Sequence, residues 1–323
     1  MVIGGLRTAV KFGLAGLATA QAAVIATLMI ADRRRRRGRQ HVGFPTAPPQ
    51  TMPADETEVT VYTKGRDLYD DMIAAIDAAE DTVLLETYIW KGDRTGQRFK
   101  RAVTAAAERG VAVYLVYDSF ANLVVPRSFK TFHSALNVLA FPLITPGNPF
   151  AIQTYAKDHR KLLVVDEQIG YVGVYNIGKL YSDSWRDTHL RLEGPAVWEL
   201  ANAFTDFWNA QRRRHHPSLP DHGARSWEPR IRALQNMPDR MLFPVRGAYI
   251  DAIERATSSV RVTQGYFLPD ETLVDALIQA AERGVEVQVL IPEYSNHVVA
   301  DWAGRAVLGP LLEGGVRIHL YQH

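Results

Sequence analysis

A histidine, a lysine and an aspartate stand at a spacing suited to phosphate chemistry near the middle of this 323-residue chain. His159, Lys161 and Asp166 follow the pattern His-x-Lys-x4-Asp, and Gly173 and Asn176 follow as Gly-x-x-Asn. An imidazole nitrogen can attack phosphorus, an ammonium group binds non-bridging oxygens, and a carboxamide adds a neutral donor. The pattern therefore predicts phosphate chemistry that needs no metal ion and no cofactor.

The alternative interpretation is that His159 and Lys161 are ordinary polar residues at the start of a strand. For a lone histidine that interpretation would be the better one. Three fixed identities at this spacing arise by chance in roughly a few per cent of chains of this size. The Gly-x-x-Asn continuation and an internal repeat of the chain make the chance interpretation weaker still.

The elements that must position these residues begin with a hairpin. Two β-branched runs flank Glu167 and Gln168, which predicts an antiparallel hairpin over residues 160–175. If the turn has two residues, His159 lies opposite Asn176, and Lys161 projects from the same face as His159. The three side chains are then expected in one cleft.

The folded body begins near Val59 and alternates short strands with amphipathic helices, which is typical of an α/β fold. The expected strands cover residues 59–62, 83–89 and 111–117, and the expected helices cover 68–79 and 96–109. A further helix with one apolar stripe is expected to open at Pro195.

An internal repeat predicts two related lobes. Residues 107–113, Ala-Glu-Arg-Gly-Val-Ala-Val, recur at 281–287 as Ala-Glu-Arg-Gly-Val-Glu-Val, in each case a helix end, a glycine cap and a strand. Upstream, residues 86–89 have a counterpart at 264–267. A site between the lobes is a common result of such duplication. Glu86, a carboxylate in an apolar strand, is either paired structurally or lines that site.

The N-terminal region differs from the rest of the chain. Residues 1–40 carry eight basic side chains against one acidic side chain, so the remainder has a net charge of −5. Residues 13–31 hold no charge and are long enough to cross a bilayer as a helix, while a cleaved signal peptide is the alternative. Five arginines after the span favour a single-pass membrane anchor with a cytoplasmic body.

The expected domains are therefore an anchor at 1–40, a Pro-rich linker at 41–58, a first lobe at 59–216 and a partial second lobe at 217–323. A mildly acidic body argues against nucleic acid as a partner. The chain has no cysteine, which excludes disulfides and thiolate chemistry.

The motif resembles that of the phospholipase D superfamily, and other stretches resemble bacterial cardiolipin synthases in particular. These stretches are residues 85–89 (Leu-Glu-Thr-Tyr-Ile), 158–166, 185–189 (Trp-Arg-Asp-Thr-His), 193–197 and 266–271. The resemblance implies duplicated lobes with mixed central sheets flanked by helices. It also implies transfer of a phosphatidyl group from one phosphatidylglycerol to another, giving cardiolipin and glycerol.

By that resemblance His159 is the nucleophile of a phosphohistidine intermediate, and Lys161, Asn176 and the Gly173 turn bind the phosphate. Asp166 supports the histidine network. Val174 departs from the family, which usually has Ser or Gly there. A second motif should begin just after Gln322, yet the sequence stops at His323, so a second lobe lacking its catalytic part, an exposed sheet edge, self-association and weak activity are expected.

Three further residues are possible site-lining groups. Asp187 and His189 follow the hairpin, although a structural aspartate and a half-buried histidine are as plausible. Tyr266 corresponds to Tyr88 in the repeat, although aromatic residues at strand ends commonly belong to the core. Two other functions stay open: a phospholipase D-type phosphodiesterase acting on lipid or nucleic acid, and a catalytically incomplete, membrane-tethered protein that binds lipid or a partner chain.

Overall fold

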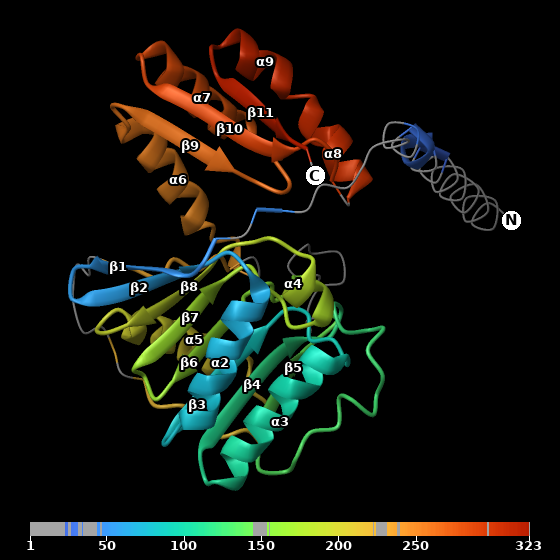
Figure 1. The fold of residues 1–323 in the computed structure, drawn as a ribbon, viewed down its shortest axis with the longest axis vertical. Coiled ribbons are helices and arrows are strands. Elements are labelled where there is room, and N and C mark those ends of the chain that lie inside the picture. The colour runs from blue at the N-terminus through green and yellow to red at the C-terminus, as the bar shows by residue number, and fades with distance from the viewer. Residues whose placement is uncertain are drawn as a thin grey trace, which may run out of the picture. The chain divides into compact units, whose positions relative to one another are not determined.

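The computed structural model describes residues 23–24, 27–31, 34, 44–45, 47–144, 154, 156–221, 223, 231–237, 240–295 and 297–322. The chain divides into two compact units. One is Phe44–Pro244, and the other combines Val245–His323 with Met1–Gly43. Figure 1 shows the helices and strands of each unit.

An eight-stranded mixed sheet forms the centre of the unit Phe44–Pro244. Its order is β1-β2-β8-β7-β6-β3-β4-β5, in which β3, β4 and β5 are parallel and every other neighbouring pair is antiparallel. The strands are β1 (Gln50–Ala54), β2 (Thr57–Tyr62), β3 (Thr82–Thr87), β4 (Ala112–Asp118), β5 (Asn137–Phe141), β6 (Leu162–Val165), β7 (Ile169–Gly173) and β8 (His189–Glu193). The predicted α/β class is confirmed.

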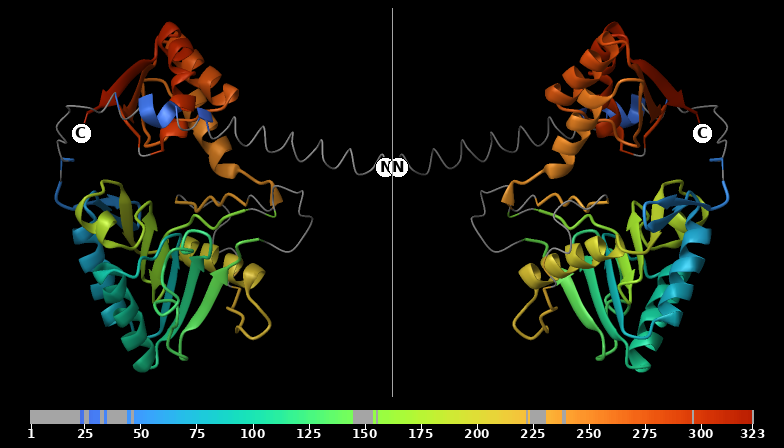
Figure 2. Two further views of the ribbon diagram at one scale, coloured as in Figure 1. Left: turned by 90° about the vertical axis from the view of Figure 1, so that its right-hand side faces the viewer. Right: turned by 90° about the vertical axis from the view of Figure 1, so that its left-hand side faces the viewer.

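Helices cover both faces of this sheet (Figures 1 and 2). On one face α2 (Gly65–Ala78) and α3 (Arg94–Glu108) bury their apolar stripes with the short α4 (Lys179–Asp183) beside them. On the other face α5 (Val197–Gln211) packs its apolar stripe, with the side chains of Phe204 and Trp208 fully buried. Alternate residues of each strand therefore serve two separate cores, as a sheet covered on both sides requires.

The local sequence explains why α3 starts and stops where it does. The Asp93 carboxylate accepts the Gly96 N–H at 3.1 Å as an N-cap, and Gly110 follows the helix with φ of 99°, a conformation that favours glycine. Parallel β3 and β4 joined by α3 form a βαβ unit. The helix is thus fixed at both ends by its local sequence.

The linker prediction is wrong for its last residues. Gln50–Ala54 form the edge strand β1, which pairs antiparallel with β2, and β2 begins at Thr57. Pro53 is compatible with this strand because an edge strand tolerates a residue that donates no hydrogen bond. Proline content alone therefore predicted a spacer where the chain forms the edge strand of the sheet.

The unit that contains Val245–His323 has a smaller sheet. Strands β9 (Ser259–Thr263), β10 (Glu286–Pro292) and β11 (Arg317–Tyr321) are all parallel, in the order β11-β10-β9, so the described strands do not form the mixed sheet expected for this lobe. The helices are α6 (Pro244–Arg255), α7 (Glu271–Glu282), α8 (Val298–Arg305) and α9 (Leu308–Glu313).

The predicted membrane span at residues 13–31 lies mostly outside the described residues. Among the residues that are described, no helix has the length and apolar character needed to cross a bilayer.

Candidate active site

The hairpin that carries the histidine motif is present, but its loop is longer than expected. β6 and β7 pair antiparallel from Val165 opposite Ile169 onward, which leaves three residues in the loop. Two of these, Asp166 and Glu167, have φ values of 52° and 51°. The two-residue turn was wrong, and the register shifts by one residue. As a result Lys161 lies next to Gly173, whose N–H donates to the Lys161 carbonyl oxygen at 3.4 Å.

Asp166 explains the change in the loop. Its carboxylate accepts the backbone N–H groups of Glu80, Asp81 and Thr82 at 2.7 to 2.9 Å, at the start of β3. Together with the Asp166 N–H, which donates to the Thr82 carbonyl oxygen at 2.9 Å, these bonds tie the loop to the neighbouring strand β3. His159 precedes the other end of β6, so the structure does not bring Asp166 to the histidine that it was expected to support.

The other motif residues gather around Tyr88 and Ile89, just beyond β3. The His159 ring lies 4.5 Å from the Tyr88 ring centroid to centroid, and Lys161 Nζ lies 5.1 Å from the Tyr88 centroid. Lys161 Nζ also donates to the His159 carbonyl oxygen at 2.6 Å. Asn176 Oδ1 accepts the Ile89 N–H at 3.1 Å. His159, Lys161 and Asn176 thus all contact Tyr88 or Ile89, although the predicted register of the hairpin was off by one residue.

Sequence reasoning missed Tyr88 as part of this group. Its ring lies against both the His159 imidazole and the Lys161 ammonium group, and therefore limits the orientations of the two side chains. The signal was available, because Tyr88 belongs to residues 86–89, which have a counterpart in the internal repeat.

Burial sets the protonation states needed for attack on phosphorus. It lowers the pKa of His159 to about 4, and the Lys161 charge adds to the effect. It lowers the pKa of Lys161 to about 8, a fall that the carboxylates of Asp158, Asp187, Glu86 and Asp118 oppose. At neutral pH the imidazole is therefore uncharged, with a free lone pair, while the ammonium group is still largely protonated.

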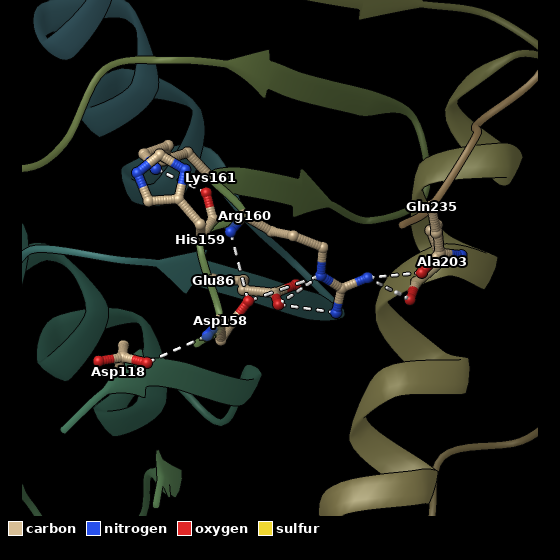
Figure 3. A network of polar contacts seen from close by, with 8 residues as sticks. All are labelled: Glu86, Asp118, Asp158, His159, Arg160, Lys161, Ala203 and Gln235. Carbon is tan, nitrogen blue, oxygen red and sulfur yellow. Dashed lines mark hydrogen bonds and ion pairs between the residues drawn. The ribbon is translucent and has the colours of Figure 1, made fainter. Parts of the chain in front are cut away.

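Arg160 points away from His159 and Lys161 (Figure 3). Its guanidinium group lies 2.7 Å from the Glu86 carboxylate and 3.7 Å from that of Asp158. It also donates to the Ala203 carbonyl oxygen on α5 at 3.2 Å and to Gln235 Oε1 at 2.6 Å. Glu86 is thus paired structurally on the α5 side of the sheet and does not line the histidine side.

Two buried carboxyl groups share this one guanidinium group. The side chains of Glu86 and Asp158 are 0% and 1% exposed. Burial is the largest cause that raises the pKa of each, and the Arg160 charge opposes it. Asp118, also buried, accepts the Asp158 backbone N–H at 3.0 Å. This network fixes the main chain of residue 158 and hence the start of the motif.

Gly173 makes room for a histidine. A Cβ atom on Gly173 would lie 2.7 Å from His189 Cα and 2.8 Å from His189 Cγ. The His189 ring is buried, and neither ring nitrogen has a hydrogen-bond partner among the residues that the structure describes. Burial lowers the pKa of His189 to about 3, with the Lys161 charge adding to it. His189 is therefore a neutral imidazole near Lys161, on the β8 residue paired with Gly173.

Of the remaining predicted residues, Asp187 is close enough for its charge to act on Lys161, and Tyr266 lies in the other unit. The Asp187 N–H donates to the Tyr175 hydroxyl at 3.0 Å, and burial raises the pKa of the Asp187 carboxyl. Tyr266 belongs to the second unit, where its ring contacts His297 at a centroid distance of 5.0 Å.

Comparisons with known proteins agree with the motif. Residues 72–208 and 249–323 match the family described as "Cardiolipin synthase, PLD-like domain". The major cardiolipin synthase ClsA of Bacillus subtilis is 30% identical over 282 residues, which cover 83% of this chain and 58% of that protein. A cardiolipin synthase of Staphylococcus aureus is 30% identical over 289 residues, which cover 83% and 56%. The chain thus spans less than two thirds of the length of these relatives.

Among solved structures, the phosphatidylserine synthase of Haemophilus influenzae shares the fold. Its TM-score is 0.56 at 13% sequence identity, and the match covers 76% of this chain and 63% of that one. At this identity the match supports the architecture of the sheet and its helices.

Proposed function

Because this chain belongs to the cardiolipin synthase family of phospholipase D-like proteins, we propose that it transfers phosphatidyl groups between phosphatidylglycerol molecules, with His159 as the nucleophile. The observation that carries the proposal is the neutral His159 imidazole held beside the Lys161 ammonium group and the Tyr88 ring. Among nucleophiles for phosphorus, an uncharged imidazole next to a cation is well suited.

The proposed reaction has two displacements. A lone pair of His159 attacks the phosphorus of one phosphatidylglycerol, a phosphorus–nitrogen bond forms, the phosphorus–oxygen bond to glycerol breaks, and glycerol leaves after taking a proton from water. A hydroxyl of a second phosphatidylglycerol then attacks the same phosphorus and gives its proton back to water, the phosphorus–nitrogen bond breaks, and cardiolipin is released. Lys161 and Asn176 hold the non-bridging oxygens during both steps, where negative charge gathers. Attack by water in the second step would give phosphatidic acid instead.

Trapping the covalent intermediate tests this proposal. The full chain is mixed with phosphatidylglycerol labelled with ³²P and denatured in base, in which a phosphorus–nitrogen bond to histidine survives. Wild-type protein is expected to retain label that acid then releases, and His159→Ala is expected to retain none. Label of equal amount on His159→Ala overturns the assignment. The ratio of cardiolipin to phosphatidic acid in the products separates a transferase from a hydrolase.

We also propose that residues 13–31 anchor the chain as a single span, with the body in the cytoplasm. The uncharged span and the following arginines support this orientation. Protease added to intact cells is expected to leave the body uncut and to digest it after lysis. Digestion in intact cells refutes the orientation.

A further inference from the structure

A group of apolar side chains is exposed at the carboxyl end of β4 and β5, in the same unit as His159. We call it the apolar patch. It consists of Phe120, Leu123, Val124, Leu143 and Ile144, with exposed fractions of 49%, 58%, 82%, 40% and 56%. Contiguous exposed apolar groups of this kind commonly mark a surface that binds something.

The patch is continuous although two segments build it. β4 and β5 are parallel neighbours, so the segments that follow them leave the sheet at the same end of the strands. There the Ser119 N–H donates to the Phe141 carbonyl oxygen at 3.0 Å. Lys157 joins them again. Its Nζ lies 5.0 Å from the Phe120 ring centroid and donates to the Leu143 carbonyl oxygen at 2.7 Å.

The patch borders the candidate active site. Lys157 stands two residues before His159 in the chain. The next residue, Asp158, donates its N–H to Asp118 at the end of β4, directly before the segment that carries Phe120. The connection between patch and nucleophile is therefore short and braced by a buried hydrogen bond.

The segment of sequence that carries the patch has charges of one sign. From Ser119 to Lys157 the sequence contains no aspartate or glutamate, while Arg127, Lys130 and Lys157 are basic. Aromatic and aliphatic side chains flanked by cations suit shallow insertion into an anionic bilayer, in which apolar groups reach the acyl boundary and ammonium groups stay at the phosphate level.

We propose that the apolar patch inserts into the surface of an anionic phospholipid bilayer and sets the mouth of the active site at the headgroup level. This inference rests on the proposed function, which supplies phospholipid as the substrate class. It does not require that the chain completes the reaction. A phospholipid then reaches His159 without leaving the membrane, because Lys157 lies at the border of the patch and the motif.

A single labelled residue tests the proposal cleanly, because the natural chain has no cysteine. Val124→Cys in the full chain is labelled with an environment-sensitive fluorophore and mixed with phosphatidylglycerol vesicles that contain spin-labelled acyl chains. Met52→Cys on the opposite edge strand β1 is the matched control, since its side chain is also exposed. We expect quenching at residue 124 to exceed that at residue 52 by about twofold or more, and to weaken in phosphatidylcholine vesicles.

Equal quenching at the two positions overturns the proposal. So does a probe at residue 124 that becomes shielded without vesicles as protein concentration rises, which would indicate a protein contact. The same measurement on a His159→Ala background is expected to be unchanged. If residue 124 is quenched while no covalent intermediate forms, the proposed function fails and the lipid surface stands. If the intermediate forms while residue 124 stays in water, the patch proposal alone fails.

Discussion

The helices α3 and α7 end in the same way in the two units of the chain. Arg109 follows α3 and donates from its guanidinium group to the carbonyl oxygens of Ile76 and Ala79, at the end of the preceding helix. Arg283 follows α7 and donates likewise to Ile253 and Glu254. A glycine with positive φ comes next in both, and a parallel strand follows. The sequence repeat is thus matched by a repeat of contacts.

The strands beside these helices differ in what they carry. Glu86 on β3 is paired with Val116, and Thr263 on β9 is paired with Leu290 at the corresponding position. The register therefore moves the predicted counterpart of Glu86 from Gln264 to Thr263. Glu86 is fully buried and Thr263 is exposed. On its other side β3 pairs with β6, whereas among the described residues β9 pairs only with β10.

The comparison teaches that the helix and strand repeat builds a frame, and that the histidine and the two basic side chains come with the hairpin. Arg160, Lys161 and His159 all precede β6, and each acts on groups at the end of β3. Four experiments sharpen or break this comparison.

The largest expected effect is on stability, at Arg160. Replacement with Ala leaves Glu86 and Asp158 buried without a cation, which should destabilise the unit Phe44–Pro244 by about 3–5 kcal/mol. Thr263→Ala, at the corresponding frame position of Glu86, should change the stability of the other unit by less than about 0.5 kcal/mol. Urea unfolding with hydrogen exchange at β3 and β9 measures both. A small effect at Arg160 would mean that the carboxyl groups are neutral without it.

The next effect is on rate, at Lys161. Lys161→Met should slow phosphatidyl transfer by about 10²–10³-fold, because the charge on the transferring phosphate loses its cation. In wild-type protein the rate should fall as pH rises through about 8, where Lys161 loses its proton, and as pH falls toward about 4, where His159 gains one. Lys161→Arg keeps its proton and should lack the alkaline fall. If the rate of Lys161→Arg still falls as pH rises through about 8, the loss of activity at alkaline pH belongs to another group.

A smaller effect concerns the pH dependence of stability at His189. Its pKa in the folded state, about 3, lies below the ordinary value of 6.5, so the unfolded chain binds the proton first. Stability from this residue is complete above pH 6.5 and is lost as pH falls toward 3, by about 1.4 kcal/mol per pH unit. His189→Gln should remove that slope in denaturation curves between pH 6.5 and 5. If the stability of the variant and that of the wild type change equally with pH, the argument from burial of His189 is contradicted.

The smallest effect tests the repeat itself. A Cβ atom at Gly110 or Gly284 would meet no atom within 4 Å, so replacement with Ala costs only the strain of φ values of 99° and 88°. Each change should destabilise its own unit by roughly 1 kcal/mol. Thermal unfolding of the two variants compares them directly. Unequal losses would show that the two caps are not equivalent.

Local pattern was enough to predict the frame and three of the residues that gather around Tyr88 and Ile89. Strand and helix periodicity located β3, α3 and β4 within two residues, and motif spacing selected His159, Lys161 and Asn176. Long-range bonds decided the rest. The loop at Asp166 depends on amide groups 84 to 86 residues away, and the pairing of Arg160 with Glu86 joins residues 74 apart. No pattern within a short window reports such contacts.

The same separations set an order of events during folding. Thr82 on β3 pairs with Ala112 on β4, about 30 residues along, whereas β3 meets β6 across about 80 residues. Because closing a shorter loop costs less entropy, we expect α2 through β4 to assemble first and the hairpin to dock late. Until it docks, Glu86 stays in water, and docking buries Glu86 together with most of the Arg160 side chain. Hairpin mutations should therefore speed unfolding and leave the folding rate almost unchanged.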